Sequence, residues 1–126
     1  MSLPIVLMVD DDKNSRDITR LFLRDICEID FALTGPESIK MVAEKKYDAI
    51  IMDINLGRGM DGLQATKVIR EMPEYENVAI LALTAFAMAG DREEFLTMGC
   101  THYLSKPFTR EELVKVMKEV LIYNNP

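Results

Sequence analysis

The sequence predicts an α/β fold, a doubly wound, five-stranded parallel sheet with helices on both faces. Short apolar runs alternate with amphipathic helical patterns along the chain, five of each. Several apolar runs stop abruptly at an aspartate or a threonine, as expected of strands buried on both faces. The 126 residues, 48% of them hydrophobic, provide one core but are too few for two. Because crossovers between parallel strands are right-handed, a doubly wound sheet is the simplest topology. We expect one domain over residues 1–126, with a polar tail over about 123–126.

The first strand is predicted over residues 4–9, an apolar run that ends in three consecutive aspartates. Asp12 stands directly before the next helical pattern and fits the N-cap of the first helix. That helix carries a predicted apolar stripe at Ile18, Leu21, Phe22 and Ile26. Residues 28–33 then alternate polar and apolar side chains, which predicts a strand near an edge of the sheet.

The middle of the chain repeats this alternation. Thr34 and Glu37 form a capping box for the second helix. Its apolar stripe is predicted at Ile39, Val42 and Ala43. Residues 48–52 make a buried third strand that stops at an aspartate, and a glycine-rich loop over residues 55–62 follows. The third helix is stopped by Pro73, and its apolar face is predicted at Ala65, Val68, Ile69 and Met72.

The last third of the chain adds two strands and two helices. Residues 78–83 predict a fourth buried strand, and residues 88–98 a helix followed by a glycine suited to a C-terminal cap. A short fifth strand is expected over residues 101–104. Thr109 and Glu112 form the capping box of the last helix. Its apolar stripe is predicted at Leu113, Val116, Met117 and Val120.

The charge balance argues against several classes of partner. With 15 basic and 21 acidic residues, the net charge is −6, a poor basis for binding nucleic acid through a general electrostatic surface. The chain has no polybasic stretch for anionic lipid and no apolar run near the ~20 residues that span a bilayer. Its first residues do not read as a signal peptide. We therefore expect a cytoplasmic protein without a nucleic-acid or membrane partner.

Cys27 and Cys100 stand far apart in the chain, with His102 as the only histidine. These residues are too few for a disulfide scaffold or a tetrahedral zinc site. Two reduced thiols that act as small core residues are favoured over a redox role. His102 is interpreted as a structural or exposed side chain.

Five polar side chains follow or end the predicted strands, namely Asp10, Asp11, Asp53, Thr84 and Lys106. In a doubly wound sheet the carboxyl ends of the strands lie along one edge, where ligands bind. Two like charges ~4 Å apart repel by about 4 kcal/mol at an effective dielectric constant of about 20, so three carboxylates need cations. A divalent ion and Lys106 would balance them, and carboxylate oxygens with waters suit Mg²⁺ better than zinc.

This constellation resembles the receiver domain of two-component response regulators over essentially the whole chain. The resemblance rests on five motifs in the order and approximate spacing of that family: Val9-Asp10-Asp11, Ile51-Met52-Asp53, Asp61-Gly62, Ala82-Leu83-Thr84-Ala85 and Ser105-Lys106-Pro107-Phe108. Each motif alone is weak, whereas five in register are specific. The resemblance implies a flavodoxin-like sheet of strand order 2-1-3-4-5.

The resemblance also implies a chemistry for the site. Asp53 would accept a phosphoryl group from the phosphohistidine of a histidine kinase or a histidine phosphotransfer protein, becoming an acyl phosphate. Asp11 would bind Mg²⁺ directly, with Mn²⁺ as an alternative ion, and Asp10 largely through water. Asp53 and the backbone carbonyl of Asn55 would complete the protein ligands. Lys106 and the metal would offset charge on the transferring phosphoryl oxygens.

A switch is implied as well. The Thr84 hydroxyl would bind the phosphoryl group and move inward, and Tyr103 would swing inward behind it. The surface formed by the fourth helix, the fifth strand and the fifth helix would then change its downstream partner. In this family the residue two positions past the threonine tunes the acyl-phosphate lifetime, so Phe86 is expected to shield the phosphoryl group from water. Such a domain signals and does not turn over a free substrate.

Two alternatives stay open. A small magnesium-dependent phosphatase of the haloacid-dehalogenase type also uses an aspartate at a strand end. That family has a second aspartate two residues later as acid and base, and Asn55 stands there instead. A docking module that is never phosphorylated is the other alternative. The loop after Asp53 also departs from many receivers, because it lacks a proline, is one residue longer and has glycines at positions 57 and 59.

Overall fold

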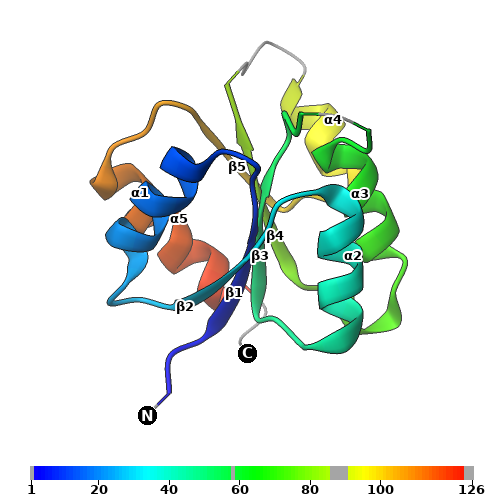
Figure 1. Ribbon diagram of the computed structural model, residues 1–126, viewed down its shortest axis with the longest axis horizontal. Coiled ribbons are helices and arrows are strands. Elements are labelled where there is room, and N and C mark those ends of the chain that lie inside the picture. Colours follow the sequence, from blue (N-terminus) through cyan, green and yellow to red (C-terminus); the bar gives the residue numbers. More distant parts are fainter. Residues whose placement is uncertain (1, 58, 86–90, 124–126) are drawn as a thin grey trace.

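Five parallel strands form one sheet in the order β2-β1-β3-β4-β5, as the resemblance implied (Figure 1). The structure is a computed structural model and describes residues 2–57, 59–85 and 91–123. The strands are β1 (Ile5–Val9), β2 (Glu28–Ala32), β3 (Ala49–Asp53), β4 (Ala79–Thr84) and β5 (His102–Ser105). Their bounds differ from the predicted ones by one residue at one or both ends. The reversal of strand order lies between β1 and β3, so the carboxyl ends of these two strands face the position where ligands bind in such sheets.

Helices cover both faces of the sheet. In Figure 1, α1 and α5 lie on one side of the sheet, and α2, α3 and α4 lie on the other. The helices are α1 (Lys13–Leu23), α2 (Gly35–Glu44), α3 (Gly62–Arg70), α4 (Asp91–Met98) and α5 (Arg110–Ile122), with a 3₁₀ turn at Pro73–Tyr75 before β4. The first three residues of the helix predicted over 88–98 lie outside the described residues, as does most of the expected polar tail.

The core consists of two apolar layers, one on each face of the sheet. Ile50 and Ile80 pack on the side of α2 and α3, whereas Ile51 and Leu81 pack on the side of α1 and α5. This separation follows from the alternation of side chains along a strand. Every residue of β3 and β4 is buried, while β2 and β5 at the edges are partly exposed. The distinction between central and edge strands agrees with the sequence pattern.

Four helices begin with a polar side chain that accepts a hydrogen bond from the third helical residue. These N-caps are Asp12, Thr34, Asp61 and Thr109. The capping box at Thr109 is reciprocal, as predicted. At the second helix, however, the Glu37 carboxylate accepts from the amide of Leu33 at 2.8 Å, one residue before Thr34.

The predicted apolar stripe of the first helix is wrong in part. Ile18 and Leu21 are 46% and 58% exposed. The fully buried side chains of α1 are instead Thr19 and Leu23, with Phe22 packed beside them. Thr19 is a polar residue at a core position, so hydrophobicity alone placed the buried face incorrectly. In α2, Ala43 is likewise exposed, and Ser38 takes its place on the buried face.

Both cysteines are free and buried. Burial raises the pKa of each thiol to about 11. Such thiols are poor nucleophiles at neutral pH, which supports their interpretation as core residues. Gly99 follows α4 with φ of +115°, a backbone conformation that favours glycine, as its predicted capping role requires.

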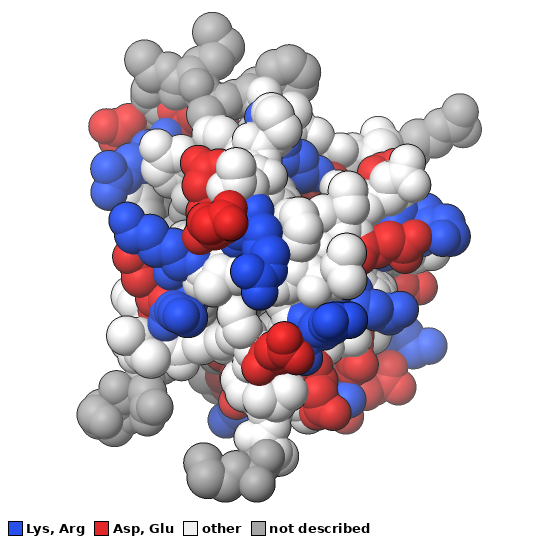
Figure 2. Space-filling model, turned by 90° about the vertical axis from the view of Figure 1, so that its left-hand side faces the viewer, with Lys and Arg blue, Asp and Glu red and all other residues white. Residues whose placement is uncertain are grey.

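Among the described residues, no helix is both long and apolar enough to cross a bilayer. Figure 2 shows the face formed by α1 and α5, on which basic and acidic side chains are interspersed. This face therefore presents no extended field of one sign.

Candidate functional site

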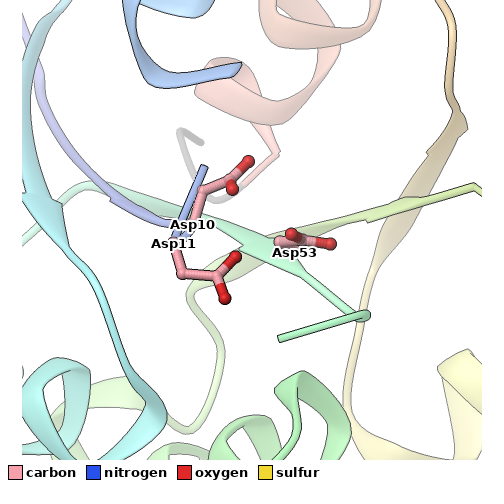
Figure 3. Close-up of side chains that lie close together, drawn as sticks. All are labelled: Asp10, Asp11 and Asp53. Carbon is pink, nitrogen blue, oxygen red and sulfur yellow. The ribbon is translucent and has the colours of Figure 1, made fainter. Parts of the chain in front are cut away.

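Three carboxylates meet at the carboxyl ends of β1 and β3. Asp10 and Asp11 follow β1, and Asp53 is the last residue of β3. The two strands are neighbours in the sheet, with Val9 paired to Met52. One oxygen from each of the three carboxylates lies within 4.8 Å of the others. Figure 3 shows the three side chains together at this edge of the sheet. Sequence reasoning therefore identified a true spatial cluster.

The cluster is largely removed from water. Asp10 is fully buried and Asp53 is 4% exposed, whereas Asp11 faces solvent. Burial raises the pKa of the Asp53 carboxyl group. The Lys106 ammonium opposes that rise, and the Asp10 carboxylate adds to it. The folded protein therefore binds a proton at Asp53 more readily than an exposed aspartate would, and added positive charge opposes this effect.

Lys106, the residue after β5, supplies positive charge to the cluster. Its Nζ lies 3.5 Å from Oδ2 of Asp10 and 3.6 Å from Oδ2 of Asp53. The same ammonium lies 3.4 Å from Oγ of Ser15. At these distances it acts mainly as a charge and not through short hydrogen bonds. The amide of Lys106 donates to the carbonyl of Thr84 at 2.8 Å, which fixes the lysine next to β4.

Backbone amides hold the carboxylates in place. Oδ1 of Asp10 accepts from the amide of Asp12 at 2.9 Å, and Oδ1 of Asp53 accepts from the amide of Asn55 at 3.0 Å. Oδ2 of Asp11 accepts from the amide of Gly57 at 3.0 Å. These bonds tie the carboxylates to the loops that follow β1 and β3, so their positions are set by the fold.

Glycine is required at position 62 for steric reasons. A Cβ there would lie 2.3 Å from the carbonyl oxygen of Asp53 and 2.8 Å from Cα of Ile54. Both contacts are with backbone, which cannot turn away as a flexible side chain would. Gly62 therefore lets α3 begin directly against the end of β3, and it explains why the Asp61-Gly62 motif accompanies the carboxylates.

The donor set fits a magnesium ion. Two buried carboxylates and one exposed carboxylate offer hard oxygen ligands within a small volume. Magnesium in proteins is held by carboxylate oxygens and retained waters. A +2 ion together with Lys106 would balance the three negative charges, and it would also offset the desolvation of Asp53. The side-chain oxygen of Asn55 accepts from the amide of Ala85 at 3.3 Å, which links the loop after β3 to the end of β4.

The residues expected to form a switch lie on the adjoining strands. Thr84 ends β4, is 2% exposed and stands opposite Ser105 of β5. Tyr103 is 39% exposed, and its ring centroid lies 6.4 Å from that of Phe95 in α4. Phe86, expected to shield a phosphoryl group, lies outside the described residues. The peptide bond between Lys106 and Pro107 is cis.

His102 is partly buried, and its Nδ1 lies 2.7 Å from Oγ1 of Thr101. Burial lowers the pKa of this imidazole. The interpretation of His102 as a structural residue is consistent with this placement.

Two contributors to the site were missed from the sequence. Ser15 reaches Lys106 from the first turn of α1, and Gly57 reaches Asp11 through its backbone amide. A serine in a first helical turn reads as a capping or solvent-exposed residue, so no sequence signal marks it. For Gly57 the only signal was the glycine-rich character of the loop, which does not identify a partner.

Comparison with known proteins gives one consistent result. The family model described as the response regulator receiver domain matches residues 6–118. The chain is 34% identical over 125 residues to the probable transcriptional regulator ycf29 of Porphyra purpurea, covering 99% of this chain and 59% of that protein. It is 30% identical over 121 residues to the polar-differentiation response regulator DivK of Brucella ovis, covering 96% and 98% of the two chains. The chain therefore spans only part of one relative and nearly all of the other.

Solved structures resemble the whole fold. The chemotaxis protein CheY4 of Vibrio cholerae superposes with a TM-score of 0.89 at 31% identity, covering 95% of this chain and all of that one. The receiver domain of the sensor histidine kinase PA1611 from Pseudomonas aeruginosa superposes with a TM-score of 0.86 at 33% identity, covering 95% and 98%. The PA1611 structure has a magnesium ion coordinated in its active-site cleft.

Proposed function

The chain belongs to the response regulator receiver domain family, the phosphoacceptor domain of two-component signalling systems, and we propose that Asp53 is its phosphoacceptor. In this proposal the phosphoryl group comes from the phosphohistidine of a histidine kinase or a histidine phosphotransfer protein. The observation that carries the proposal is the placement of Asp53, a buried carboxylate that shares a 4.8 Å cluster with Asp10 and Asp11 and lies 3.6 Å from Lys106.

The transfer forms one bond and breaks one bond. An oxygen of the ionised Asp53 carboxylate attacks the phosphorus atom, an O–P bond forms, and the P–N bond to the donor imidazole breaks. The imidazole nitrogen leaves with the electron pair of that bond. Lys106, held beside Asp10 and Asp53, offsets negative charge on the phosphoryl oxygens during the transfer.

A divalent cation would be held by Asp10, Asp11, Asp53 and the backbone carbonyl of Asn55. When bound, it would neutralise charge on the phosphoryl oxygens and orient them. Mg²⁺ is proposed because the donors are hard oxygen atoms and because the PA1611 receiver coordinates this ion in its cleft. Mn²⁺ is the alternative ion, since it prefers the same ligands.

We extend the proposal to a switch. The Thr84 hydroxyl binds a phosphoryl oxygen, Thr84 moves inward, and Tyr103 follows from its half-exposed position. The surface of α4, β5 and α5 then presents a different face to a downstream effector. Because Tyr103 packs against Phe95 of α4, a movement of its ring would be transmitted to that helix.

The proposed unit is the whole of residues 1–126, acting in the cytoplasm as a signalling domain without turnover of a free substrate. Two observations weigh against a phosphatase. Asn55 stands where that chemistry needs an acid, and its side-chain oxygen is engaged by the amide of Ala85.

The test is the intact mass of the protein after incubation with Mg²⁺ and acetyl phosphate. Wild type is expected to gain one phosphoryl group that hydroxylamine removes, and Asp53→Asn is expected to gain none. A phosphorylated histidine kinase or phosphotransfer protein is then offered as donor. Failure of wild type to accept a phosphoryl group from either source would favour the docking module, and steady hydrolysis of a generic phosphate ester would favour the phosphatase.

A further inference from the structure

The loop between β3 and α3 holds the exposed carboxylate of the cluster. The amide of Gly57 donates to Oδ2 of Asp11 at 3.0 Å, across 46 positions of sequence. Within the described part of the chain this is the one hydrogen bond to that carboxylate. A bond from an amide to a carboxylate is of the charge-assisted kind, which is stronger than a bond between neutral groups.

The loop is anchored on both sides of this contact. Leu56 is buried in the core layer beneath α2 and α3. Met60 packs against the start of α2, where a Cβ on Gly35 would lie 3.0 Å from its Cγ. The amide of Gly57 is therefore carried by a segment fixed to the core, although Gly57 itself is exposed.

A side chain at position 57 would disturb this contact. A Cβ there would lie 2.7 Å from Oδ2 of Asp11, so the exposed Asp11 carboxylate would have to turn away from the Gly57 amide to make room. Gly59, in the same loop, is a glycine for its backbone conformation. Its φ is +75°, and a Cβ there would have no atom within 4 Å. Substitution of Gly57 therefore tests the contact with Asp11, whereas substitution of Gly59 tests the backbone conformation of the loop.

We propose that Gly57 is a positioning residue for the cation of the acidic cluster, an inference that rests on the proposed function. Its N–H occupies Oδ2 of Asp11 and leaves Oδ1 to bind the ion. Groups that hydrogen-bond to a ligating carboxylate orient it, and their loss weakens metal affinity about 10- to 100-fold. Gly57 would thereby contribute to metal binding without itself supplying a ligand.

The test compares the Mg²⁺ dissociation constants of wild type, Gly57→Ala and Gly59→Ala by calorimetric titration of the full chain. In Gly57→Ala the N–H is kept, but the new Cβ displaces the Asp11 carboxylate from it, so the Kd is expected to rise about tenfold or more. Gly59→Ala, which strains the same loop without touching the site, is expected to stay close to wild type. No change in Gly57→Ala, or the same weakening in both variants, would overturn the inference.

A second measurement does not depend on the glycine variants. The Gly57 amide proton is observed by NMR without metal, in wild type and in Asp11→Ala. Removal of the carboxylate acceptor is expected to shift this proton upfield, and an unmoved resonance would overturn the inference. A wild-type protein that binds no Mg²⁺ would contradict the proposed function together with this inference. Binding by wild type with an unchanged Kd in Gly57→Ala would contradict the role of Gly57 alone.

Discussion

The Nζ atom of Lys106 lies 3.6 Å from Oδ2 of Asp53, although β3 and β5 are not neighbours in the sheet. Asp53 ends β3 and Lys106 follows β5, so the lysine side chain extends past the end of β4. The contact brings the end of β3 and the residue after β5 into one site. Its consequences for stability and for phosphoryl transfer can be measured separately.

Removal of the Asp53 charge should stabilise the metal-free protein. Asp53 is buried beside Asp10, and like charges at such separations repel by a few kcal/mol when poorly screened. Because Lys106 offsets part of this cost, we expect Asp53→Asn to gain about 1 kcal/mol, or roughly 3–6 °C in unfolding temperature. The measurement is thermal unfolding in EDTA and in Mg²⁺, and Mg²⁺ should raise the Tm of wild type more than that of the variant. An equal increase in Tm with Mg²⁺ in both proteins would mean that the Asp53 carboxylate does not interact measurably with the other two.

The same charge should make stability depend on pH. Burial raises the pKa of Asp53 above its unfolded value, so the folded protein binds the proton more tightly than the unfolded chain does. The stabilisation from this proton is present at low pH and is lost as pH rises from about 4 through the folded pKa. The difference in free energy of unfolding between wild type and Asp53→Asn should therefore grow in favour of the variant over that range. Urea unfolding of metal-free protein from pH 4 to pH 8 measures it.

The matched control for the pH experiment is Glu76→Gln, which removes an exposed carboxylate from the loop before β4. If the free energy of unfolding relative to wild type changed equally with pH in both variants, the ionisation of Asp53 would not be the cause.

Loss of the Lys106 ammonium should destabilise the metal-free protein. Lys106→Met leaves the buried Asp10 and Asp53 carboxylates without their cation, which should cost about 1–3 kcal/mol. Lys13→Met is the control, because the ion pair of Lys13 with Asp17 is largely exposed and should contribute under about 0.5 kcal/mol. Urea unfolding in EDTA compares the two, and similar losses would show that Lys106 is also only a surface charge.

Thr84 should couple phosphorylation to Tyr103 without being needed to accept the phosphoryl group. In Thr84→Ala, Asp53 should still become phosphorylated, but the ring resonances of Tyr103 should stay at their unphosphorylated positions. Thr84→Ser keeps the hydroxyl and should restore the shift. NMR of the aromatic side chains before and after acetyl phosphate tests this. Full movement of the Tyr103 resonances in Thr84→Ala would contradict the proposed switch.

The parts of the fold that were predictable are those in which local pattern and burial agree. The apolar runs of β3 and β4 are followed by polar residues, and parallel pairing buries both of their faces. The orientation of α1 was not predictable in the same way, since it depends on the surface that α5 presents. Thr19 is fully buried in that helix, and in the described structure its hydroxyl has no hydrogen-bond partner. A hydrophobicity pattern cannot place such a residue.

The acidic cluster was predictable because topology alone aligns the ends of β1 and β3. The contacts of Ser15 with Lys106 and of Gly57 with Asp11 were not predictable, because they depend on the conformations of the segments that follow β1 and β3. Arg70 illustrates the same limit outside the site. Its guanidinium donates to the carbonyls of Tyr75, Val78 and Gly99, three backbone groups from separate segments. In the sequence Arg70 reads only as a basic residue at a helix end.

The central claim is that Asp53, and no other carboxylate of the cluster, carries the phosphoryl group. Borohydride reduces an aspartyl phosphate to homoserine, which leaves a permanent mark at the modified position. The protein would be treated with acetyl phosphate and Mg²⁺, reduced, digested and sequenced by mass spectrometry. We predict homoserine at position 53 alone. Homoserine at position 10 or 11, or a phosphorylated protein without any homoserine, would contradict the claim.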